Sequence, residues 1–220
     1  MILRYLVALP CYNNSETVEK VIVDTLNTTQ FSVLVVDDGS DVPVQAGLTA
    51  PVIRAALESG RLQFLRHSEN LGKGAAIQSA FKWALQRNFT HVLTMDTDGQ
   101  HLAHLIGKVI ERSLENPWSL IIGSRKWQEG TVPGSSKFGR KFSNFWVNFE
   151  TGYKALDSQS GFRAYPLFHV QNLSFFTKKY DFEIEVLIRL LWNNVDVQEV
   201  DIEVYYPPGK ERVTHFNKFS

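Results

Sequence analysis

The segment Phe31–Val36, with the sequence FSVLVV, ends in an unbroken apolar run that is rich in β-branched residues. A strand with one face in water alternates apolar and polar side chains, whereas a strand covered on both faces does not need to. Short apolar runs also occur at Tyr5–Leu9 and His91–Met95, and amphipathic stretches separate the three. This alternation predicts a largely parallel sheet with helices on both of its faces.

The remaining segments extend the same series along the chain. We expect strands at Tyr5–Leu9, Phe31–Val36, Leu62–Leu65, His91–Met95, Leu120–Gly123 and Val197–Tyr205, and helices around Val18–Leu26, Gly72–Arg87, Leu102–Glu115, Ser136–Phe149 and Phe182–Trp192. Asp157–Tyr165 reads as a loop or a short strand. With no internal repeat and no flexible linker, the sequence predicts an α/β fold in a single domain over residues 1–220.

Composition excludes several classes of protein. Lys and Arg number 23 and Asp and Glu also number 23, so the chain lacks the overall positive charge of a nucleic-acid-binding protein. A single cysteine, Cys11, excludes a disulfide framework and a multi-cysteine zinc site. No stretch approaches the roughly 18 apolar residues of a membrane span. We therefore expect a cytoplasmic protein, or one bound peripherally at the cytosolic face of a membrane.

Polar turns follow four of the predicted strands. They are Pro10–Asn13, Asp37–Ser40, Asp96–His101 and Gly123–Arg125. Ligands of open α/β sheets bind beyond the carboxyl ends of the strands, and in a parallel sheet these ends share one edge. The sequence thus predicts a binding site at this edge, with acidic and arginine-bearing turns close together.

The tripeptide Asp96-Thr97-Asp98 carries the clearest chemical signal. Two carboxylates spaced i and i+2 after a buried strand can converge on one cation, and oxygen ligands suit Mg²⁺ or Mn²⁺. The same residues also make good turn chemistry, and taken alone the tripeptide favours a solvated acidic turn. The second acidic turn, Asp37-Asp38, makes a binding site more favourable than a solvated turn, because the repulsion between two such turns needs a cation or hydrogen-bond donors to offset it.

The glycine-bearing segment Asn70–Gly74 precedes a predicted helix and could approach an anion at the helix N-terminus, although a simple helix cap explains it equally well. It fits neither a Walker phosphate loop nor a dinucleotide fingerprint.

Taken in order, six segments resemble one known family. They read LPCYNN, VVDDGS, ENLGKGAAI, MDTDGQH, GSR and SQSGFRAY, and the likeness spans roughly residues 3 to 216. Together they resemble the inverting family-2 glycosyltransferases of the GT-A fold, a Rossmann-like, mostly parallel sheet sandwiched by helices. The branch most similar is that of the dolichyl-phosphate mannose synthases and polyprenyl-phosphate glycosyltransferases.

The resemblance implies a role for each matching residue. The donor nucleotide would contact Pro10, Tyr12, Asn13, Glu16, Asp37, Asp38, Lys73 and Asp96. The metal, Mg²⁺ or Mn²⁺, would contact Asp96, Asp98 and Gln100, and phosphate groups of donor or acceptor would face Arg125, Arg140 and Arg163. The catalytic residues would be Asp98, Arg125, Asp157 and Arg163. A metal and arginine forks would stabilise the charge of a nucleoside diphosphate leaving group.

The implied activity is transfer of one sugar from a UDP- or GDP-sugar to a polyprenyl- or dolichyl-phosphate acceptor, as in the biosynthesis of cell-envelope glycans. Two departures bear on the acceptor. The chain has no Gln-x-x-Arg-Trp segment, unlike processive polysaccharide synthases, and it has no membrane helices after the catalytic region. Either the protein is soluble or peripheral, or the sequence is part of a longer chain.

Other functions remain open at this point. A hydroxyl acceptor would need a general base, for which Asp157, Glu183 and Glu185 are candidates, whereas a phosphate monoester is largely dianionic at neutral pH and needs none. A catalytically idle nucleotide-binding module is a further alternative. A nucleotidyltransferase is disfavoured, because its first loop should be rich in glycine and basic residues, unlike Pro10–Asn13.

One predicted helix carries an aromatic face. Phe138, Phe142, Phe145, Trp146 and Phe149 share it, with Lys137, Arg140 and Lys141 as basic neighbours. Such a face either packs on the sheet, which we favour, or lies at a membrane surface. A second aromatic and basic cluster comprises Phe175, Phe176, Lys178, Lys179 and Tyr180.

Overall fold

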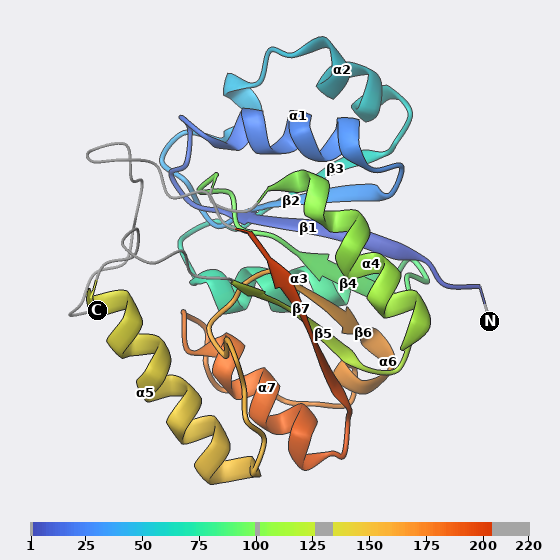
Figure 1. The fold of residues 1–220 in the computed structure, drawn as a ribbon. Coiled ribbons are helices and arrows are strands. Elements are labelled where there is room, and N and C mark those ends of the chain that lie inside the picture. The colour runs from blue at the N-terminus through green and yellow to red at the C-terminus, as the bar shows by residue number, and fades with distance from the viewer. Residues whose placement is uncertain (1, 100–101, 126–133, 204–220) are drawn as a thin grey trace.

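A seven-stranded sheet forms the centre of the molecule, with the strand order β3-β2-β1-β4-β6-β5-β7 (Figure 1). The computed structural model describes residues 2–99, 102–125 and 134–203, and for residues 134–138 it describes the backbone alone. Helices cover both faces of the sheet, as the alternating pattern of the sequence predicts.

The elements follow one another in the expected alternation. The strands are β1 (Tyr5–Cys11), β2 (Ser32–Asp37), β3 (Leu62–Arg66), β4 (His91–Thr94), β5 (Leu120–Arg125), β6 (Arg163–Pro166) and β7 (Val197–Ile202). The α-helices are α1 (Val18–Thr28), α2 (Pro51–Glu58), α3 (Lys73–Leu85), α4 (Ile106–Glu115), α5 (Gly134–Thr151), α6 (Leu167–Val170) and α7 (Phe182–Trp192), and 3-10 turns span Val44–Gly47 and Ala103–Leu105.

The strands of the sheet are parallel except for β6, so the prediction of a mostly parallel sheet is confirmed. β6 is antiparallel to both of its neighbours, β4 and β5, and Arg163 at its start pairs with Thr94 and Ile122. Because β6 runs in reverse, the loop that precedes it enters the sheet at the carboxyl ends of β4 and β5. The reversal therefore brings residues 157–162 to the edge where the polar turns lie.

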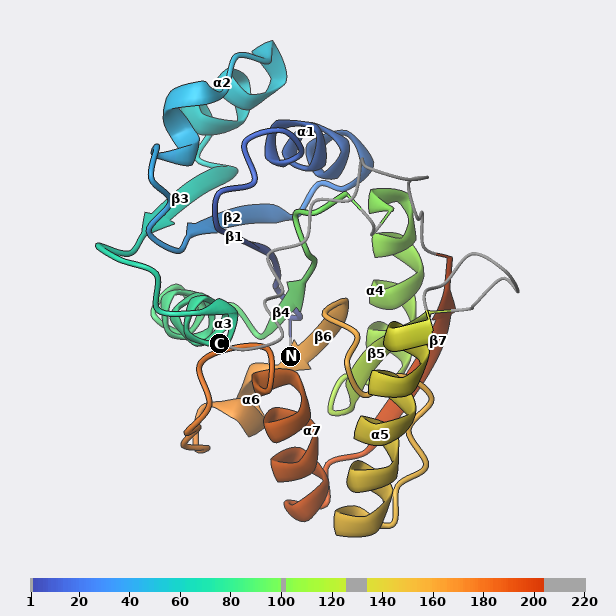
Figure 2. The ribbon, with the colours of Figure 1, turned by 90° about the vertical axis from the view of Figure 1, so that its left-hand side faces the viewer.

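Strand β1 shows why its sequence is apolar without interruption. Tyr5, Val7 and Leu9 pack into one core cluster, which includes the inner faces of α1, α2 and α4. Leu6 and Ala8 point to the opposite side, into a second cluster with α3, α5, α6 and α7. Figure 2 shows these two groups of helices on opposite sides of the sheet. With a core on each face, every position of the strand is buried.

Some boundaries differ from those that the sequence predicts. The expected helix over Leu102–Glu115 begins as a 3-10 turn and becomes α-helical at Ile106. The last strand ends at Ile202, and the final residues of the predicted strand lie outside the described residues. Helix α2 was not expected from the sequence; it begins with Pro51, whose fixed φ suits the first turn of a helix.

The expectation that the aromatic face of α5 packs on the sheet is wrong. Phe142, Phe145, Trp146 and Phe149 are all exposed. Ser143 and Val147, on the opposite side of the helix, are buried instead. The side chains of Lys137 and Phe138 lie outside the described residues. Among the described helices, none has both the length and the apolar composition that crossing a bilayer requires.

Gly39, in the turn after β2, offers a test of how tightly this edge of the sheet is built. It has a φ of +72°, and an added Cβ would lie 2.6 Å from the backbone oxygen of Glu69. Gly60 has the same φ, yet the nearest atom to its added Cβ would be 4.0 Å away. We expect Gly60→Ala to lower the free energy of unfolding by about 1 kcal/mol, and Gly39→Ala to lower it by about 3 kcal/mol, because only the latter adds a backbone collision.

Urea unfolding of the two variants measures the difference. Equal losses of stability in Gly39→Ala and Gly60→Ala would show that the turn after β2 can move away from residue 69.

Candidate active site

The polar turns do meet at one edge of the sheet. In the parallel register Cys11 lies opposite Asp37 and Ala8 lies opposite Thr94, so the turns after β1, β2 and β4 begin at the same level. The reversed strand β6 adds the loop of residues 157–162 to them. Segments far apart in the sequence thus form one polar surface.

The Asp-Thr-Asp turn is fixed through its central residue. The Thr97 hydroxyl donates to the Pro10 carbonyl at 3.0 Å and accepts from Asn14 Nδ2 at 2.8 Å. The Thr97 carbonyl accepts from the Thr17 hydroxyl at 2.5 Å. Thr97 is buried, whereas Asp96 and Asp98 on either side reach the surface. The anchored threonine therefore sets the backbone positions from which both carboxylates project.

Lys73, at the start of α3, lies between two carboxylates. Its Nζ is 2.6 Å from Asp96 Oδ1 and 2.7 Å from Glu183 Oε1, and the Glu183 side chain is only 2% exposed. Burial acts to lower the pKa of Lys73, but the charges and hydrogen bonds of Asp96 and Glu183 outweigh it and raise the pKa above its ordinary value. Lys73 therefore stays charged and offsets part of the negative charge at the acidic turn.

The loop before β6 closes against this cluster. A Cβ added at Gly161 would lie 2.6 Å from Lys73 Nζ and 2.7 Å from Asp96 Oδ2. The Thr94 hydroxyl also donates to the Gly161 carbonyl at 2.7 Å. A side chain at this position would displace the ends of Lys73 or Asp96, so the glycine of the SQSGFR segment lets the loop approach the ion pair closely.

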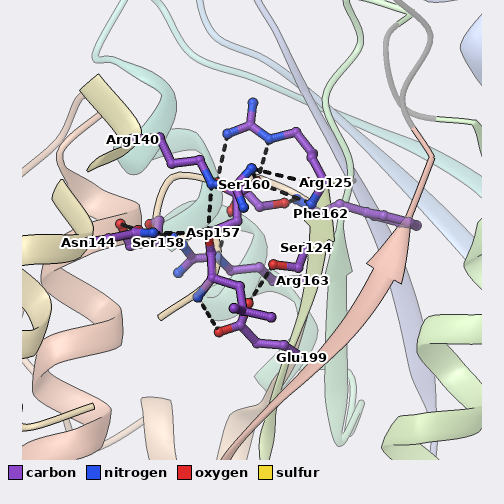
Figure 3. Close-up of polar contacts among 11 residues, drawn as sticks. Ser124, Arg125, Arg140, Asn144, Asp157, Ser158, Ser160, Phe162, Arg163 and Glu199 are labelled. Atoms are coloured by element: carbon purple, nitrogen blue, oxygen red, sulfur yellow. Dashed lines mark hydrogen bonds and ion pairs between the residues drawn. The ribbon is translucent and has the colours of Figure 1, made fainter. Parts of the chain in front are cut away.

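Asp157 organises two arginines (Figure 3). The carboxylate accepts from Arg125 Nε at 2.6 Å and from Arg125 Nη2 at 2.9 Å, and it lies 3.8 Å from Arg140 Nη1. Arg140 also donates to the backbone carbonyls of Arg125 and Leu156. Asp157 has no exposed surface; its burial acts to raise its pKa, but the two arginines outweigh that effect and the pKa is lowered.

Arg163, for which the resemblance implies a contact with phosphate, lies inside the protein. It is completely buried, and its guanidinium donates to the carbonyls of Ser158, Ser160 and Glu183, each at 2.7 Å. In this conformation Arg163 joins the 158–160 loop to the start of α7.

Asp37 is held by donors from the protein itself. Its carboxylate accepts from the backbone amides of Ser40 at 2.9 Å and Val44 at 3.2 Å and forms an ion pair with Arg66. Burial acts to raise the pKa of Asp37, but these contacts outweigh it and lower the pKa. Arg66 was not singled out in the sequence, yet it ends the strand next to β2 and lies directly opposite Asp37 in the register.

Asp38 caps the glycine-bearing loop before α3. It accepts from the amides of Leu71 at 3.0 Å and Gly72 at 2.8 Å, and lies 2.6 Å from His67 Nδ1. Both aspartates of this turn are thus buried and satisfied within the protein. Backbone amides and the Arg66 guanidinium offset their charge.

The first loop is tied to the second. Asn13, with a φ of +52°, donates its backbone amide to Ser40 Oγ at 3.0 Å, and its side chain exchanges hydrogen bonds with Asp41. Tyr12 and Asn13 are half-buried and Glu16 is exposed, whereas Pro10 is buried within β1. Gln100, the third predicted metal ligand, lies outside the described residues.

Two further residues support the site and were not assigned to it from the sequence. Glu199 of β7 accepts from the hydroxyls of Ser124 at 2.5 Å and Tyr153 at 3.0 Å, and from the Leu156 amide at 2.8 Å, which holds the loop before Asp157 to β5. Tyr180 lies near the acidic turn. Burial raises its pKa; the charge of Lys73 opposes this, and the charges of nearby carboxylates, Asp98 among them, act in the same direction as burial.

The carboxylate oxygens of Asp96 and Asp98 are the kind of ligand that a hard divalent cation prefers. Within the described ranges there is no group of three or more His, Cys, Asp or Glu side chains that could hold a metal ion. Mg²⁺ commonly takes one or two carboxylates and completes its shell with water and substrate phosphates. Two aspartates are therefore a sufficient protein contribution for a metal that binds together with a diphosphate.

Removing the charge of Asp157 should lower the free energy of unfolding by an amount that depends on pH. We expect Asp157→Asn to lower the free energy of unfolding by about 3 kcal/mol at neutral pH, because it breaks a buried ion pair. The folded-state pKa of Asp157 lies below its unfolded value, so its contribution is present above the unfolded pKa and disappears as the pH falls through the folded pKa. The difference from wild type should therefore shrink below about pH 4.

Urea unfolding at neutral pH and at stepwise lower pH measures this effect. The matched control is Asp24→Asn, which removes an exposed pair with Lys20 at 2.8 Å and should change stability by less than about 0.5 kcal/mol. If both variants lose the same stability at neutral pH, the buried pair does not have the strength assigned to it.

The chain matches the model of glycosyl transferase family 2 over residues 6–172. It is 30% identical over 206 residues to a polyprenol monophosphomannose synthase of Mycolicibacterium smegmatis, covering 90% of this chain and 76% of the relative. It is 27% identical to a UDP-N-acetylglucosamine–dolichyl-phosphate N-acetylglucosaminyltransferase of Methanococcus voltae, covering 93% and 86% of the two chains.

Solved structures share the fold. Glucosyl-3-phosphoglycerate synthase of Mycobacterium tuberculosis, crystallised with UDP, superimposes with a TM-score of 0.70 at 18% identity, over 94% of this chain and 73% of the other. Mannosyl-3-phosphoglycerate synthase of Rubrobacter xylanophilus gives the same TM-score and identity, over 94% and 67%. The chain belongs to glycosyl transferase family 2, has the GT-A fold and is a nucleotide-sugar-dependent glycosyltransferase.

Proposed function

We propose that this enzyme transfers one sugar, with inversion, from a UDP- or GDP-sugar to the phosphate of a polyprenyl or dolichyl lipid, at the cytosolic face of a membrane. The names of two similar proteins, which act on polyprenol and dolichyl phosphate, agree with this acceptor class. A third relative, of Micrococcus luteus, is named as an undecaprenyl-phosphate mannosyltransferase and is 28% identical over 91% of this chain.

The state of the candidate bases is the observation that carries the proposal. Asp157 has no exposed surface and is paired with Arg125, and Glu183 is buried against Lys73. Glu185 accepts from the amides of Phe176 and Thr177 and pairs with Arg189. Although burial acts to raise the pKa of Glu185, these hydrogen bonds lower it to about 2.

A carboxylate held in this way is a poor proton acceptor for a substrate hydroxyl, because it is buried or its basicity is reduced. A phosphate monoester needs no such base, since its second pKa is near 6 and it is already nucleophilic at neutral pH. The arrangement of the three carboxylates therefore favours a phosphate acceptor over a hydroxyl acceptor.

Arg125 and Arg140 are the residues that we assign to phosphate binding. Their side chains are 19% and 17% exposed, and Asp157 lies between them. A guanidinium matches the geometry of a phosphate, and a carboxylate behind it fixes its orientation. Asp157 then serves to orient the two arginines instead of removing a proton, and buried Arg163 holds the loop that carries it.

For the donor, we assign Asp96 and Asp98, with Gln100, to a divalent cation that binds the diphosphate. Solved structures with this fold contain Mn²⁺ or Mg²⁺ together with UDP, which supports a metal of this kind here. Such a metal supplies charge stabilisation for the leaving nucleoside diphosphate. Tyr12, Asn13 and Glu16 would border the nucleoside, Asp37 and Asp38 would shape its loops, and Lys73 would face the diphosphate.

Donor binding tests the metal assignment. Isothermal titration with UDP- and GDP-sugars should give binding of one nucleotide class that requires Mn²⁺ or Mg²⁺, and Asp98→Asn should weaken it at least about tenfold by removing a metal ligand. Asp24→Asn, which changes an exposed carboxylate on α1, is the control and should bind like wild type. Equal donor affinity with and without metal would remove Asp98 from this role.

The acceptor is tested by comparing a short-chain polyprenyl phosphate with the corresponding polyprenol. We expect transfer to the phosphate alone, with the anomeric configuration of the sugar inverted in the product. Comparable transfer to the polyprenol would overturn the phosphate acceptor.

Arg140 should act on the acceptor and not on the donor. We expect Arg140→Gln to lower kcat/KM for the lipid phosphate by about 10- to 100-fold, which is the value of one charged hydrogen bond, while the Kd for the donor stays unchanged. Arg140→Lys should recover part of the loss by restoring charge without the fork. A matching loss of donor affinity in Arg140→Gln would place this residue at the donor instead.

A further inference from the structure

The outer surface of α5 is a continuous aromatic face. Phe142, Phe145, Trp146 and Phe149 define it, and their exposed fractions are 55%, 60%, 43% and 69%. Soluble proteins rarely expose several large aromatic side chains next to one another, and a contiguous group of such side chains marks an interaction surface.

The four rings contact one another and form one surface. The ring centroids of Phe142 and Trp146 are 6.2 Å apart, those of Trp146 and Phe149 are 5.7 Å apart, and Phe145 stacks on Phe149 at 6.3 Å. Trp192 of α7, 58% exposed, adds an indole beside the end of α5, because its Nε1 donates to the Glu150 carbonyl at 3.2 Å.

The aromatic face points away from the rest of the protein. Ser143 and Val147, on the opposite side of α5, are buried, and Val147 belongs to the core cluster that α7 also enters. Figures 1 and 2 show α5 at the periphery of the molecule, beside α7. No described element covers its outer side.

The same helix reaches into the candidate phosphate site. Arg140, two residues before Phe142, contacts the Arg125 carbonyl and lies near the Asp157 carboxylate. A rise of about 1.5 Å per residue places the centre of the aromatic face within roughly 10 Å of Arg140 along the helix axis. A surface that binds the aromatic face is thereby held within about this axial distance of Arg140, which lies on the inward side of the same helix.

Charge around the face favours an anionic lipid surface as the occupant. Lys141 on α5 and Lys154 just beyond it are exposed, and Glu150 is the acidic residue exposed at the end of the helix. Phenylalanine and tryptophan flanked by lysine are typical of helices that lie in the headgroup region of a bilayer. A protein groove would bury such rings equally well, but it gives no reason for the neighbouring phosphate site.

We propose that the aromatic face of α5 docks the enzyme on an anionic bilayer, with Arg140 and Arg125 held at the level of the lipid phosphates. This inference rests on the proposed function, since it explains how a lipid acceptor would reach the site. The rings of Phe142, Phe145, Trp146 and Phe149 enter the headgroup region, and Lys141 and Lys154 contact anionic headgroups. Docking by one helix face alone is weak and reversible.

Sedimentation with vesicles tests the proposal. The protein should bind vesicles of phosphatidylcholine and phosphatidylglycerol more tightly than vesicles of phosphatidylcholine alone. The double variant Phe145→Ser/Phe149→Ser should lose at least about tenfold in binding, because two rings no longer leave water. Lys141→Gln should lose about fivefold on the anionic vesicles and nothing on the neutral ones.

The matched control is Phe168→Ser, in α6. Phe168 is also exposed, at 58%, but it lies near the opposite edge of the sheet, where β6 ends. This variant should bind vesicles like wild type. Circular dichroism and thermal unfolding establish that each variant is folded, and because the replaced rings are exposed we expect the double variant to keep its fold.

Two comparisons between the variants would overturn the proposal. One is equal loss of vesicle binding in the α5 variant and in Phe168→Ser. The other is a wild-type dimer that the α5 variant turns into a monomer in sedimentation velocity, with no change in vesicle binding, which would make the face an interface between two copies of the chain.

A second assay separates this inference from the proposed function. With a short-chain polyprenyl phosphate in solution and no membrane, the double variant should transfer sugar as wild type does. Transfer without any vesicle binding would reject the docking surface and keep the proposed function. Vesicle binding that depends on the aromatic face, without transfer to any lipid phosphate, would reject the proposed function and keep the docking surface.

Discussion

A buried guanidinium holds the candidate site together. Arg163 has no exposed surface, and it binds carbonyls from two segments, the 158–160 loop and the first turn of α7. Burying a charge is costly unless several hydrogen bonds satisfy it, and three strong ones do so here. Through these bonds the loop places Gly161 against the Lys73–Asp96 pair and Asp157 against Arg125. The positions of both charged clusters therefore depend on Arg163.

The two clusters are arranged alike: in each, a buried carboxylate orients a positively charged side chain at the edge of the sheet. Glu183 lies behind Lys73, and Asp157 lies behind Arg125 and Arg140. Fixed charges of this kind need little rearrangement when a phosphate arrives, and such preorganisation is a major source of electrostatic stabilisation in enzymes. Burial acts to raise the pKa of Asp157, but its contacts with Arg125 and Arg140 outweigh that effect and lower the pKa, so this orienting carboxylate stays ionised.

The sequence predicted the parallel strands and the edge where the polar turns meet, because both follow from local patterns. An unbroken apolar run such as Val33–Val36 indicates burial on both faces, and chain direction then fixes which ends hold the turns. The reversal of β6 has no such local signature, since Arg163–Pro166 is short and its direction is set by pairing with β4 and β5. The burial of Arg163 follows from that reversal, so it could not be anticipated either. The ties made by Arg66 to Asp37 and by Glu199 to Ser124 likewise require the register between strands.

Helix α5 shows a different limit of sequence patterns. Periodicity reveals that a helix has two unlike faces, but it does not say which of them turns inward. In α5 the inward side carries polar residues beside the core residue Val147: Asn144 accepts from the Ser158 amide and hydroxyl, and Ser143 accepts from Gln159. A helix that must supply Arg140 and Asn144 to a charged site has to turn those residues inward, and its aromatic residues are then left on the outside. The exposed aromatic face is thus a geometric consequence of the inward placement of Arg140 and Asn144. It puts an apolar surface on the same helix that supplies an arginine to the site.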